Sequence, residues 1–265
     1  MGPDAEPREA EPRRVNGGTR FAVVEWFAEI DSTNRYLADA ARAGAPDGRV
    51  AVADLQHAGR GRLDRQWTAA PGSSLLVSVL VRPRLPRELW TWLTGAAGLA
   101  AVDTVTSCCD LPVRTKWPND VVLDRGPAPG KLAGILAEAV GDAVVIGMGL
   151  NVAWDAVPDE LRGIATAVSL AGGRLVDRKV LLAEWLQLLD RQLGRLERAP
   201  AGGSAHMLQL LRGRSATLGR QVRAELPRGS VEGVAADIDA QGALVVEQHD
   251  GTRVTVGAGD VIHLR

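Results

Sequence analysis

The amino-acid sequence predicts an α+β fold, with a mixed sheet and helices in the larger part and a small β-barrel at the C-terminal end. Three observations support this class. Apolar strand patterns alternate with helical patterns as far as about residue 213. Beyond that point short β patterns follow one another, separated by glycines. The composition, with 46% hydrophobic and 24% charged residues, is ordinary for a water-soluble domain.

The larger part is expected to span residues 21–213. Residues 1–20 are low in hydrophobicity and contain several prolines, which predicts disorder. Asp31 and Ser32 suit the start of a first helix, and Pro86 suits the start of a second. The predicted strands are 21–30, 50–55, 74–81, 113–117, 121–123, 132–140 and 143–148, and the predicted helices are 31–43 with its cap, 86–108, 176–198 and 206–211.

The C-terminal part, residues 214–265, contains five short β patterns. Glycines 229, 242, 251 and 257 punctuate them, as expected for tight turns between antiparallel strands. The predicted strands are 221–225, 231–238, 243–248, 253–256 and 261–264.

Charge and cysteine usage exclude several classes of function. The net charge is −1, so no global positive field is present to hold nucleic acid or an anionic membrane. No apolar run approaches the roughly 20 residues that cross a bilayer, and the N-terminal stretch is not a secretory signal. The adjacent Cys108 and Cys109 are expected to be free thiols in a reducing, cytoplasmic environment.

The most informative segment runs from Gln56 to Trp67 and contains Gly59-Arg60-Gly61-Arg62. Alternating glycines let the backbone approach a ligand while two guanidinium groups converge on carboxylate or phosphate oxygens. Trp67 offers a flat surface for stacking. The alternative is a solvated Arg-Gly loop that touches RNA, although RNA binding usually brings further aromatic residues and positive charge.

A second segment, Lys116-Trp117-Pro118-Asn119-Asp120, places an ammonium, an amide and a carboxylate around a stiff turn. Lys116 suits a phosphate and Asp120 suits a magnesium ion. The alternative is a purely structural turn in which Asn119 and Asp120 bond their own backbone.

Three further segments carry polar groups next to apolar strands or helix starts. Lys131 opens a strand, where its charge is costly without an anionic partner, although it could also extend to solvent. Asn151 follows Gly147 and Gly149 and suits adenine, or else caps a turn. The run 31–34, Asp-Ser-Thr-Asn, lies at a helix start, where free N–H groups suit polar ligand atoms or simple capping.

Taken together, in this order and spacing, these segments resemble the biotin protein ligase family over residues 21–265. The matching runs are Asp31-Ser-Thr-Asn34, Gln56-x-Ala-Gly-Arg-Gly-Arg62, Lys116-Trp-Pro-Asn-Asp120, Gly130-Lys-Leu-Ala-Gly-Ile-Leu136 and Gly147-x-Gly-x-Asn151. The resemblance implies the class II synthetase-like catalytic fold of biotin and lipoate ligases, followed by a small SH3-like β-barrel. One departure is Asp64, where the family often has glycine.

The resemblance implies a two-step reaction with ATP, biotin and Mg²⁺. The biotin carboxylate attacks the α-phosphate of ATP to give biotinyl-5′-AMP, and a lysine of a biotin carboxyl carrier protein then takes the biotin. Lys131 and Arg62 are the implied catalytic residues. The implied biotin-binding residues are Ser32, Thr33, Asn34, Gln56, Arg60, Gly61, Arg62 and Lys131; the implied ATP-binding residues are Arg60, Arg62, Trp67, Lys116, Asn119 and Asn151; and Asp120 is the implied metal ligand.

Three alternatives remain at this point. A lipoate or octanoyl-transfer enzyme shares the implied fold, an RNA- or DNA-binding module would use the Arg-Gly loop, and a non-catalytic protein would bind biotin without releasing pyrophosphate. We expect no DNA-binding repression, because only about 20 residues precede the first predicted strand, and no membrane association. Monomer and homodimer are both compatible with the sequence.

Overall fold

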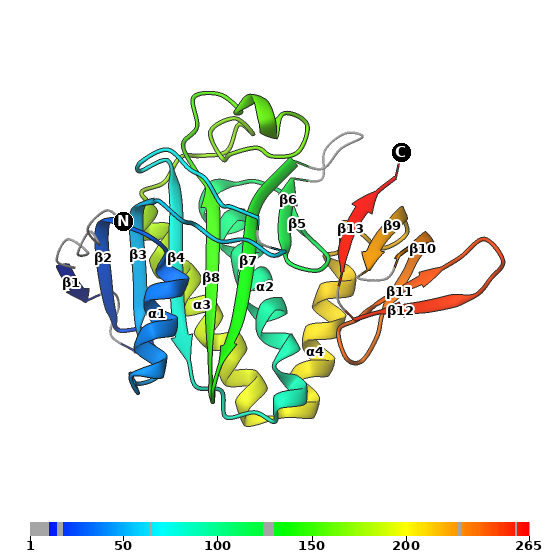
Figure 1. Cartoon of the computed structure of the whole chain (residues 1–265), viewed down its shortest axis with the longest axis horizontal. Coiled ribbons are helices and arrows are strands. Elements are labelled where there is room, and N and C mark those ends of the chain that lie inside the picture. The colour runs from blue at the N-terminus through cyan, green and yellow to red at the C-terminus, as the bar shows by residue number, and fades with distance from the viewer. Residues whose placement is uncertain are drawn as a thin grey trace, which may run out of the picture.

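The computed structural model describes residues 11–14, 18–63, 65–123, 130–226, 229–257 and 259–264. Within them, an eight-stranded mixed sheet and a five-stranded antiparallel sheet lie side by side (Figure 1). The large sheet has the order β1-β2-β3-β4-β8-β7-β6-β5. Its strands are β1 (Glu11–Arg14), β2 (Val23–Ile30), β3 (Val50–Gln56), β4 (Ser74–Val81), β5 (Val113–Lys116), β6 (Asp120–Leu123), β7 (Gly130–Val140) and β8 (Ala143–Asn151).

Helix α1 (Thr33–Arg42) covers one face of this sheet and connects the parallel strands β2 and β3 (Figure 1). Ser32 caps it with extended backbone angles, and its side chain accepts a hydrogen bond from the Arg35 amide at 3.5 Å. Leu37 packs on this face against Phe27 and Val145. The cap therefore holds the amino end of α1 over the sheet.

The other face is covered by α2 (Thr91–Cys109) and α3 (Arg178–Arg198), with α4 (Pro200–Gly213) beside them (Figure 1). Helix α2 is apolar over most of its surface, as a helix between a sheet and other helices should be, and its one charged residue, Asp103, pairs with Arg214. Trp185 of α3 is fully buried and its indole N–H donates to Ala97 O at 3.2 Å. This layer holds the larger apolar core.

The C-terminal strands form the small β domain that the sequence predicts. Its order is β12-β11-β10-β9-β13, and its strands are β9 (Gln221–Leu226), β10 (Gly229–Ile238), β11 (Leu244–Glu247), β12 (Arg253–Val256) and β13 (Asp260–His263). Trp117 packs against the core of this domain and donates from its indole N–H to Gly242 O at 3.0 Å. The turn between β5 and β6 therefore ties the small domain to the large sheet.

Three expectations need correction. Residues 11–14 form strand β1, antiparallel to β2, so disorder does not describe them; residues 1–10 and 15–17 lie outside the described part. The second helix begins at Thr91, because Pro86 is extended and a 3-10 turn, η1 (Arg87–Leu89), comes first. The last helix is longer than predicted and begins at Pro200, a residue suited to the first helical turn.

Two other findings bear on the sequence expectations. A second 3-10 turn, η2 (Asp159–Leu161), lies between β8 and α3. Among the described residues, none of the helices combines the length and apolarity needed to cross a membrane.

The packing of α3 predicts which of its residues stabilise the fold. Leu189 is fully buried in the main core, whereas Val180 on the same helix is 51% exposed. Leu189→Ala should lower the free energy of unfolding by about 2–5 kcal/mol, because it leaves a cavity in the core. Val180→Ala should change it by less than about 0.5 kcal/mol. Urea unfolding measures both, and equal effects would contradict the packing.

Candidate functional site

A cavity of about 880 Å³ lies on the α1 side of the large sheet. The segment between β3 and β4 crosses in front of β8 and β7 and covers it (Figure 1). Every site residue that the sequence predicted lines this cavity, apart from Lys116. The predicted residues at the cavity are Ser32, Thr33, Asn34, Gln56, Arg60, Gly61, Arg62, Trp67, Asn119, Asp120, Lys131 and Asn151.

One end of the cavity is a buried polar network at the start of α1. The backbone N–H and hydroxyl of Thr33 both donate to Gln56 Oε1, at 2.7 and 3.0 Å. The Ser78 hydroxyl donates to Asn34 Oδ1 at 2.6 Å. The hydroxyl oxygens of Thr33 and Ser78 are themselves 2.7 Å apart.

The hydrogen bonds of this network can form a chain that ends at Asn34. Because Gln56 Oε1 accepts from the Thr33 backbone N–H, the Thr33 hydroxyl can donate to Ser78 instead, and the Ser78 proton goes to Asn34 Oδ1. An amide oxygen has two lone pairs, and Ser78 uses one of those on Asn34. A ligand that offers an N–H donor here can bond to the other.

Glycines on β7 and β8 form the floor of the cavity. Gly134 and Gly149 are opposite each other in the antiparallel register. A Cβ at Gly149 would lie 2.4 Å from Trp67 Cε2, and one at Gly147 would lie 2.1 Å from Asn34 Oδ1. Glycine is therefore required where Trp67 and Asn34 lie directly on the sheet.

The Arg-Gly segment folds back on itself over this floor. Trp67 N–H donates to Gly59 O at 2.9 Å, and Gly61 N–H donates to Arg65 O at 2.7 Å. Asp64, within this turn, lies outside the described residues. The turn presents Arg60 and Arg62 to the cavity from one side.

Two cations sit near the middle of the cavity with different partners. Arg62 donates to two neutral oxygens, Asn119 Oδ1 at 3.2 Å and Gly259 O at 3.1 Å, and burial lowers its pKa. Lys131 Nζ lies 2.8 Å from Asp120 Oδ1 and 5.4 Å from the centre of the Trp67 ring. An anion that enters the cavity would meet both cations.

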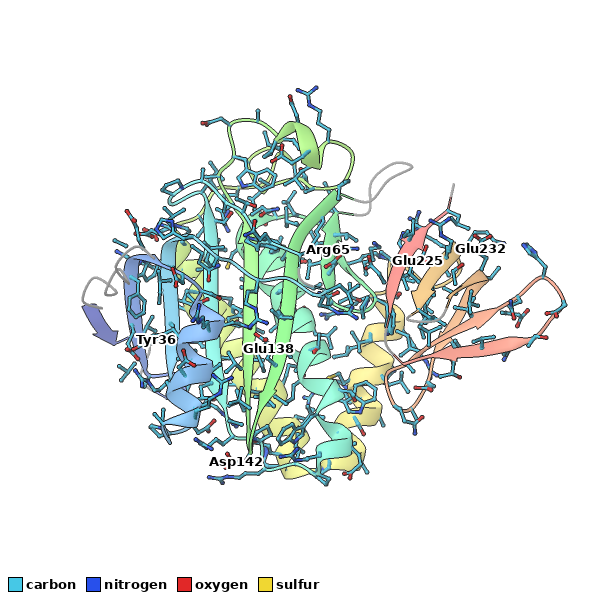
Figure 2. The ribbon with its side chains drawn as sticks, viewed as in Figure 1. Tyr36, Arg65, Glu138, Asp142, Glu225 and Glu232 are labelled. Atoms are coloured by element: carbon cyan, nitrogen blue, oxygen red, sulfur yellow. The ribbon has the colours of Figure 1, made fainter. Side chains whose placement is uncertain are left out.

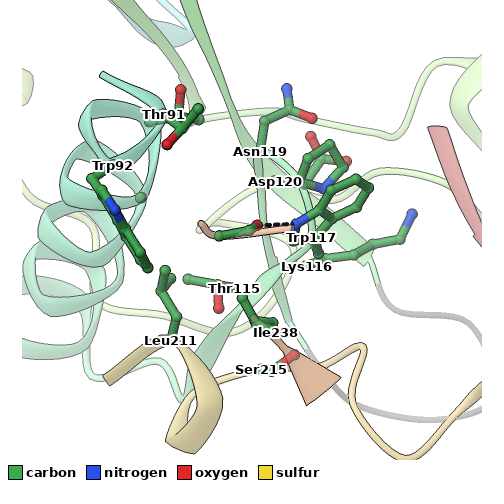
Figure 3. A pocket seen from close by; sticks show the side chains of 15 residues that line it. Thr91, Trp92, Thr115, Lys116, Trp117, Asn119, Asp120, Leu211, Ser215 and Ile238 are labelled. Carbon is green, nitrogen blue, oxygen red and sulfur yellow. Dashed lines mark hydrogen bonds between the residues drawn. The ribbon is translucent and has the colours of Figure 1, made fainter. Parts of the chain in front are cut away.

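Lys116 lies beside the cavity rather than in its wall. It borders a smaller pocket of about 60 Å³ between α2 and the β domain, where Figure 3 shows its amino group directed away from Trp92 and Leu211. Burial lowers its pKa, while the charges of Asp120 and Asp260 act in the opposite direction. A direct role for Lys116 in the large cavity remains a prediction.

Three buried polar atoms at the cavity have no hydrogen-bond partner within the described residues: Trp67 Nε1, Asn151 Oδ1 and Asp120 Oδ1. Asp120 Oδ1 has its ion pair with Lys131, which leaves Trp67 Nε1, a donor, and Asn151 Oδ1, an acceptor. The Asn151 amide nitrogen donates to Thr166 O at 3.0 Å, which fixes the oxygen as the group that a ligand could use. An unsatisfied buried donor and acceptor favour a ligand with both kinds of group.

The sequence analysis missed three residues of this region. Ser78 joins the polar network at the start of α1 from β4, Glu138 pairs with Arg60 at 2.9 Å, and Asp260 of β13 pairs with Arg65. Figure 2 shows Glu138 over the large sheet and Arg65 toward the C-terminal strands. In the sequence, the position of Glu138 within the apolar run 132–140 was the one indication that this residue has a specific partner.

Two family models match the chain. The Biotin/lipoate A/B protein ligase family matches residues 26–151, and the Biotin protein ligase C terminal domain matches residues 217–264. Among named relatives, a biotin--[acetyl-CoA-carboxylase] ligase of Mycobacterium tuberculosis (strain ATCC 25618 / H37Rv) is 39% identical over 99% of this chain and 97% of its own length. A bifunctional ligase/repressor BirA of Bacillus spizizenii is 32% identical over 84% of this chain and 69% of its own length.

Solved structures agree with these matches. A biotin protein ligase from Aquifex aeolicus in complex with biotin and ATP has a TM-score of 0.79 and 26% identity, and the match covers 91% of this chain and 99% of that one. A biotin protein ligase from Leishmania major in complex with biotinyl-5-AMP has a TM-score of 0.58 and 27% identity, covering 89% and 98%.

The glycine floor gives a prediction about Trp67. Gly149→Ala would place a methyl group 2.4 Å from Trp67 Cε2, which is too close for two carbon atoms, so the ring must move. We expect the Trp67 indole N–H signal to shift in ¹H–¹⁵N spectra. Gly98→Ala is the control, because a Cβ there approaches nothing closer than Thr115 Cγ2 at 4.0 Å. An unmoved Trp67 signal in Gly149→Ala would contradict the packing.

Proposed function

This chain belongs to the biotin protein ligase family, and we propose that it activates biotin with ATP and transfers it to a lysine of a carboxylase's biotin carrier domain. The family assignment makes it an enzyme, a biotin--protein ligase.

The acceptor that Asn34 Oδ1 offers at the end of the head network (Thr33, Asn34, Gln56 and Ser78) is the observation that carries the choice of substrate. The bicyclic head of biotin contains a ureido group, whose N–H groups can donate to this oxygen. The dithiolane ring of lipoate has no N–H or O–H to offer. Because a site that hydrogen-bonds a substrate N–H discriminates against an analogue that lacks one, the network favours biotin over lipoate.

The carboxylate end of the substrate then faces the cations. Arg60, Arg62 and Lys131 line the cavity beyond the head network. A carboxylate oxygen forms a bond to the α-phosphorus of ATP, and pyrophosphate leaves with the electrons of the broken P–O bond. Two anions must approach for this step, so fixed positive charge lowers their repulsion and stabilises charge on the phosphoryl oxygens.

The unsatisfied atoms beyond the cations suit the nucleotide. Adenine carries both donors and acceptors, so its amino group can meet Asn151 Oδ1, while the Trp67 indole offers a donor and a flat apolar surface. Asn119 holds Arg62, and Lys116 lies within electrostatic reach of Asp120. These positions support an ATP site along the middle of the cavity.

Magnesium fits this site only together with phosphate. The described residues contain no cluster of three or more groups that would hold a metal. Of the carboxylates that line the cavity, Asp120 is the one that lies beside Lys131, at 2.8 Å. Magnesium is commonly held by one or two carboxylates plus substrate phosphates, which suits Asp120. When bound, the ion would neutralise phosphate charge.

In the second step the carrier lysine attacks the acyl carbon of the adenylate. The lysine nitrogen forms the amide bond and loses a proton, and AMP leaves.

The free thiols Cys108 and Cys109 support our proposal of a reducing, cytoplasmic setting. The domain limits of 21–213 and 214–265, the absence of DNA binding, and a monomeric or homodimeric state remain predictions.

The function is tested by transfer to a carrier. The protein is mixed with Mg-ATP, biotin and an unmodified biotin carboxyl carrier domain, and a parallel reaction contains lipoate. We expect the intact mass of the carrier to rise by one biotinyl group, and no change with lipoate. Modification by lipoate alone would overturn the choice of substrate, and no pyrophosphate release with biotin would overturn the reaction.

Lys131 gives a sharper prediction about the chemistry. Lys131→Ala should lower the rate of adenylate formation on the order of 10²–10³-fold, as for the loss of one electrostatic group at a transition state. Lys179→Ala is the matched control, because Lys179 is an exposed lysine at the start of α3. Pyrophosphate release in single-turnover conditions measures both, and equal rates would contradict the role of Lys131.

A further inference from the structure

Glu138 is the one charged residue in the apolar stretch of β7 that faces α1, among the residues described there. It lies opposite Val145 of β8, a residue packed in the α1-side core. Its side chain is only 25% exposed, and no step of the proposed reaction uses it. A half-buried carboxylate in this position is costly without strong partners.

Both oxygens of this carboxylate are engaged, each with a residue of the cavity. Oε2 accepts from Asn34 Nδ2 at 2.8 Å, and Oε1 pairs with Arg60 Nη1 at 2.9 Å. Asn34 belongs to the head network and Arg60 to the turn that faces the anionic end of the substrate. Glu138 therefore connects two parts of the cavity that are 26 positions apart in sequence.

The contact with Glu138 also decides which way the Asn34 amide points. The amide nitrogen faces Glu138 Oε2 and, at 3.4 Å, Leu136 O, while the oxygen accepts from Ser78. In the opposite orientation Asn34 Oδ1 would face the carboxylate, and two acceptors would repel each other. The accepting role of Asn34 depends on this orientation, because a turned amide would present its NH₂ group to Ser78 in place of its oxygen.

We propose that Glu138 is a positioning residue that orients Asn34 to accept an N–H of the substrate head and at the same time holds the Arg60 guanidinium beside the cavity. This inference rests on the proposed function, because biotin is the ligand whose head it orients. Glu138 acts through Asn34 and Arg60 and touches no reacting atom.

The variant Glu138→Gln tests the proposal, because glutamine keeps the size but loses the charge and must turn an NH₂ group toward one of the two partners. We expect the Kd for biotin, measured by calorimetry without ATP, to rise about tenfold or more, as for a lost hydrogen bond to a charged group. The KM for biotin should rise with it, while kcat at saturating biotin changes by less than about threefold.

Glu25→Gln is the matched control. Glu25, on β2, also pairs with an arginine and a second polar group, since Arg49 Nε lies 2.9 Å from one oxygen and Tyr36 donates to the other at 2.5 Å. Neither Glu25 nor its partners line the cavity. Glu25→Gln should leave biotin affinity unchanged, and an equal loss of affinity in both variants would overturn the proposal.

A double-mutant cycle tests the connection itself. If Glu138 acts through Arg60, the effects of Glu138→Gln and Arg60→Gln on biotin affinity must not add. Additive effects would show that Glu138 does not act through Arg60. If Glu138→Gln does not fold, Glu138→Asp replaces it, because the shorter chain keeps the charge but cannot reach both partners; an unchanged affinity would then count against the proposal.

The outcomes also separate this inference from the function on which it rests. A wild-type protein that binds no biotin overturns both. Wild-type binding that is unchanged in Glu138→Gln overturns only the role of Glu138, and weaker binding with retained kcat supports it.

Discussion

The site depends on one steric constraint: two side chains must lie directly on the surface of a sheet. Asn34 and the Trp67 ring occupy space that a Cβ on β8 would fill, at 2.1 Å from Gly147 and 2.4 Å from Gly149. Sheets normally present side chains about every second residue on each face. Because Gly147 and Gly149 have no side chains, β8 has a flat surface here, while its pairing with β7 is kept. Polar residues from α1 and the Arg-Gly turn lie on this surface.

That constraint explains why polar groups gather on an otherwise apolar sheet. The α1 face continues past the floor as a hydrophobic core formed by Leu37, Leu80 and Val145. The polar network begins where this core ends, at the capped start of α1. The sheet therefore serves as a packing surface for the helix at one end and as the wall of a ligand cavity at the other.

Much of this arrangement could be predicted, because its determinants are local. Glycines at points of close approach, a capping serine and alternating apolar positions can all be recognised in the sequence. Ser78 and Glu138 could not be assigned, because their roles arise from partners on other elements, Asn34 in both cases. Lys116 was expected among the ATP-binding residues, and that role stays a prediction: it borders the smaller pocket, beside Trp117, while Asn119 and Asp120 of the same segment line both pockets.

The distribution of lysines has a practical consequence. Of the three lysines, Lys131 is paired with Asp120, Lys116 is largely enclosed, and Lys179 stands exposed at the start of α3. Helix α3 packs on the face of the sheet opposite the cavity (Figure 1). Lys179 is therefore the lysine best placed for attaching a label or a surface linker, since modification there leaves Lys131 in its ion pair at the cavity.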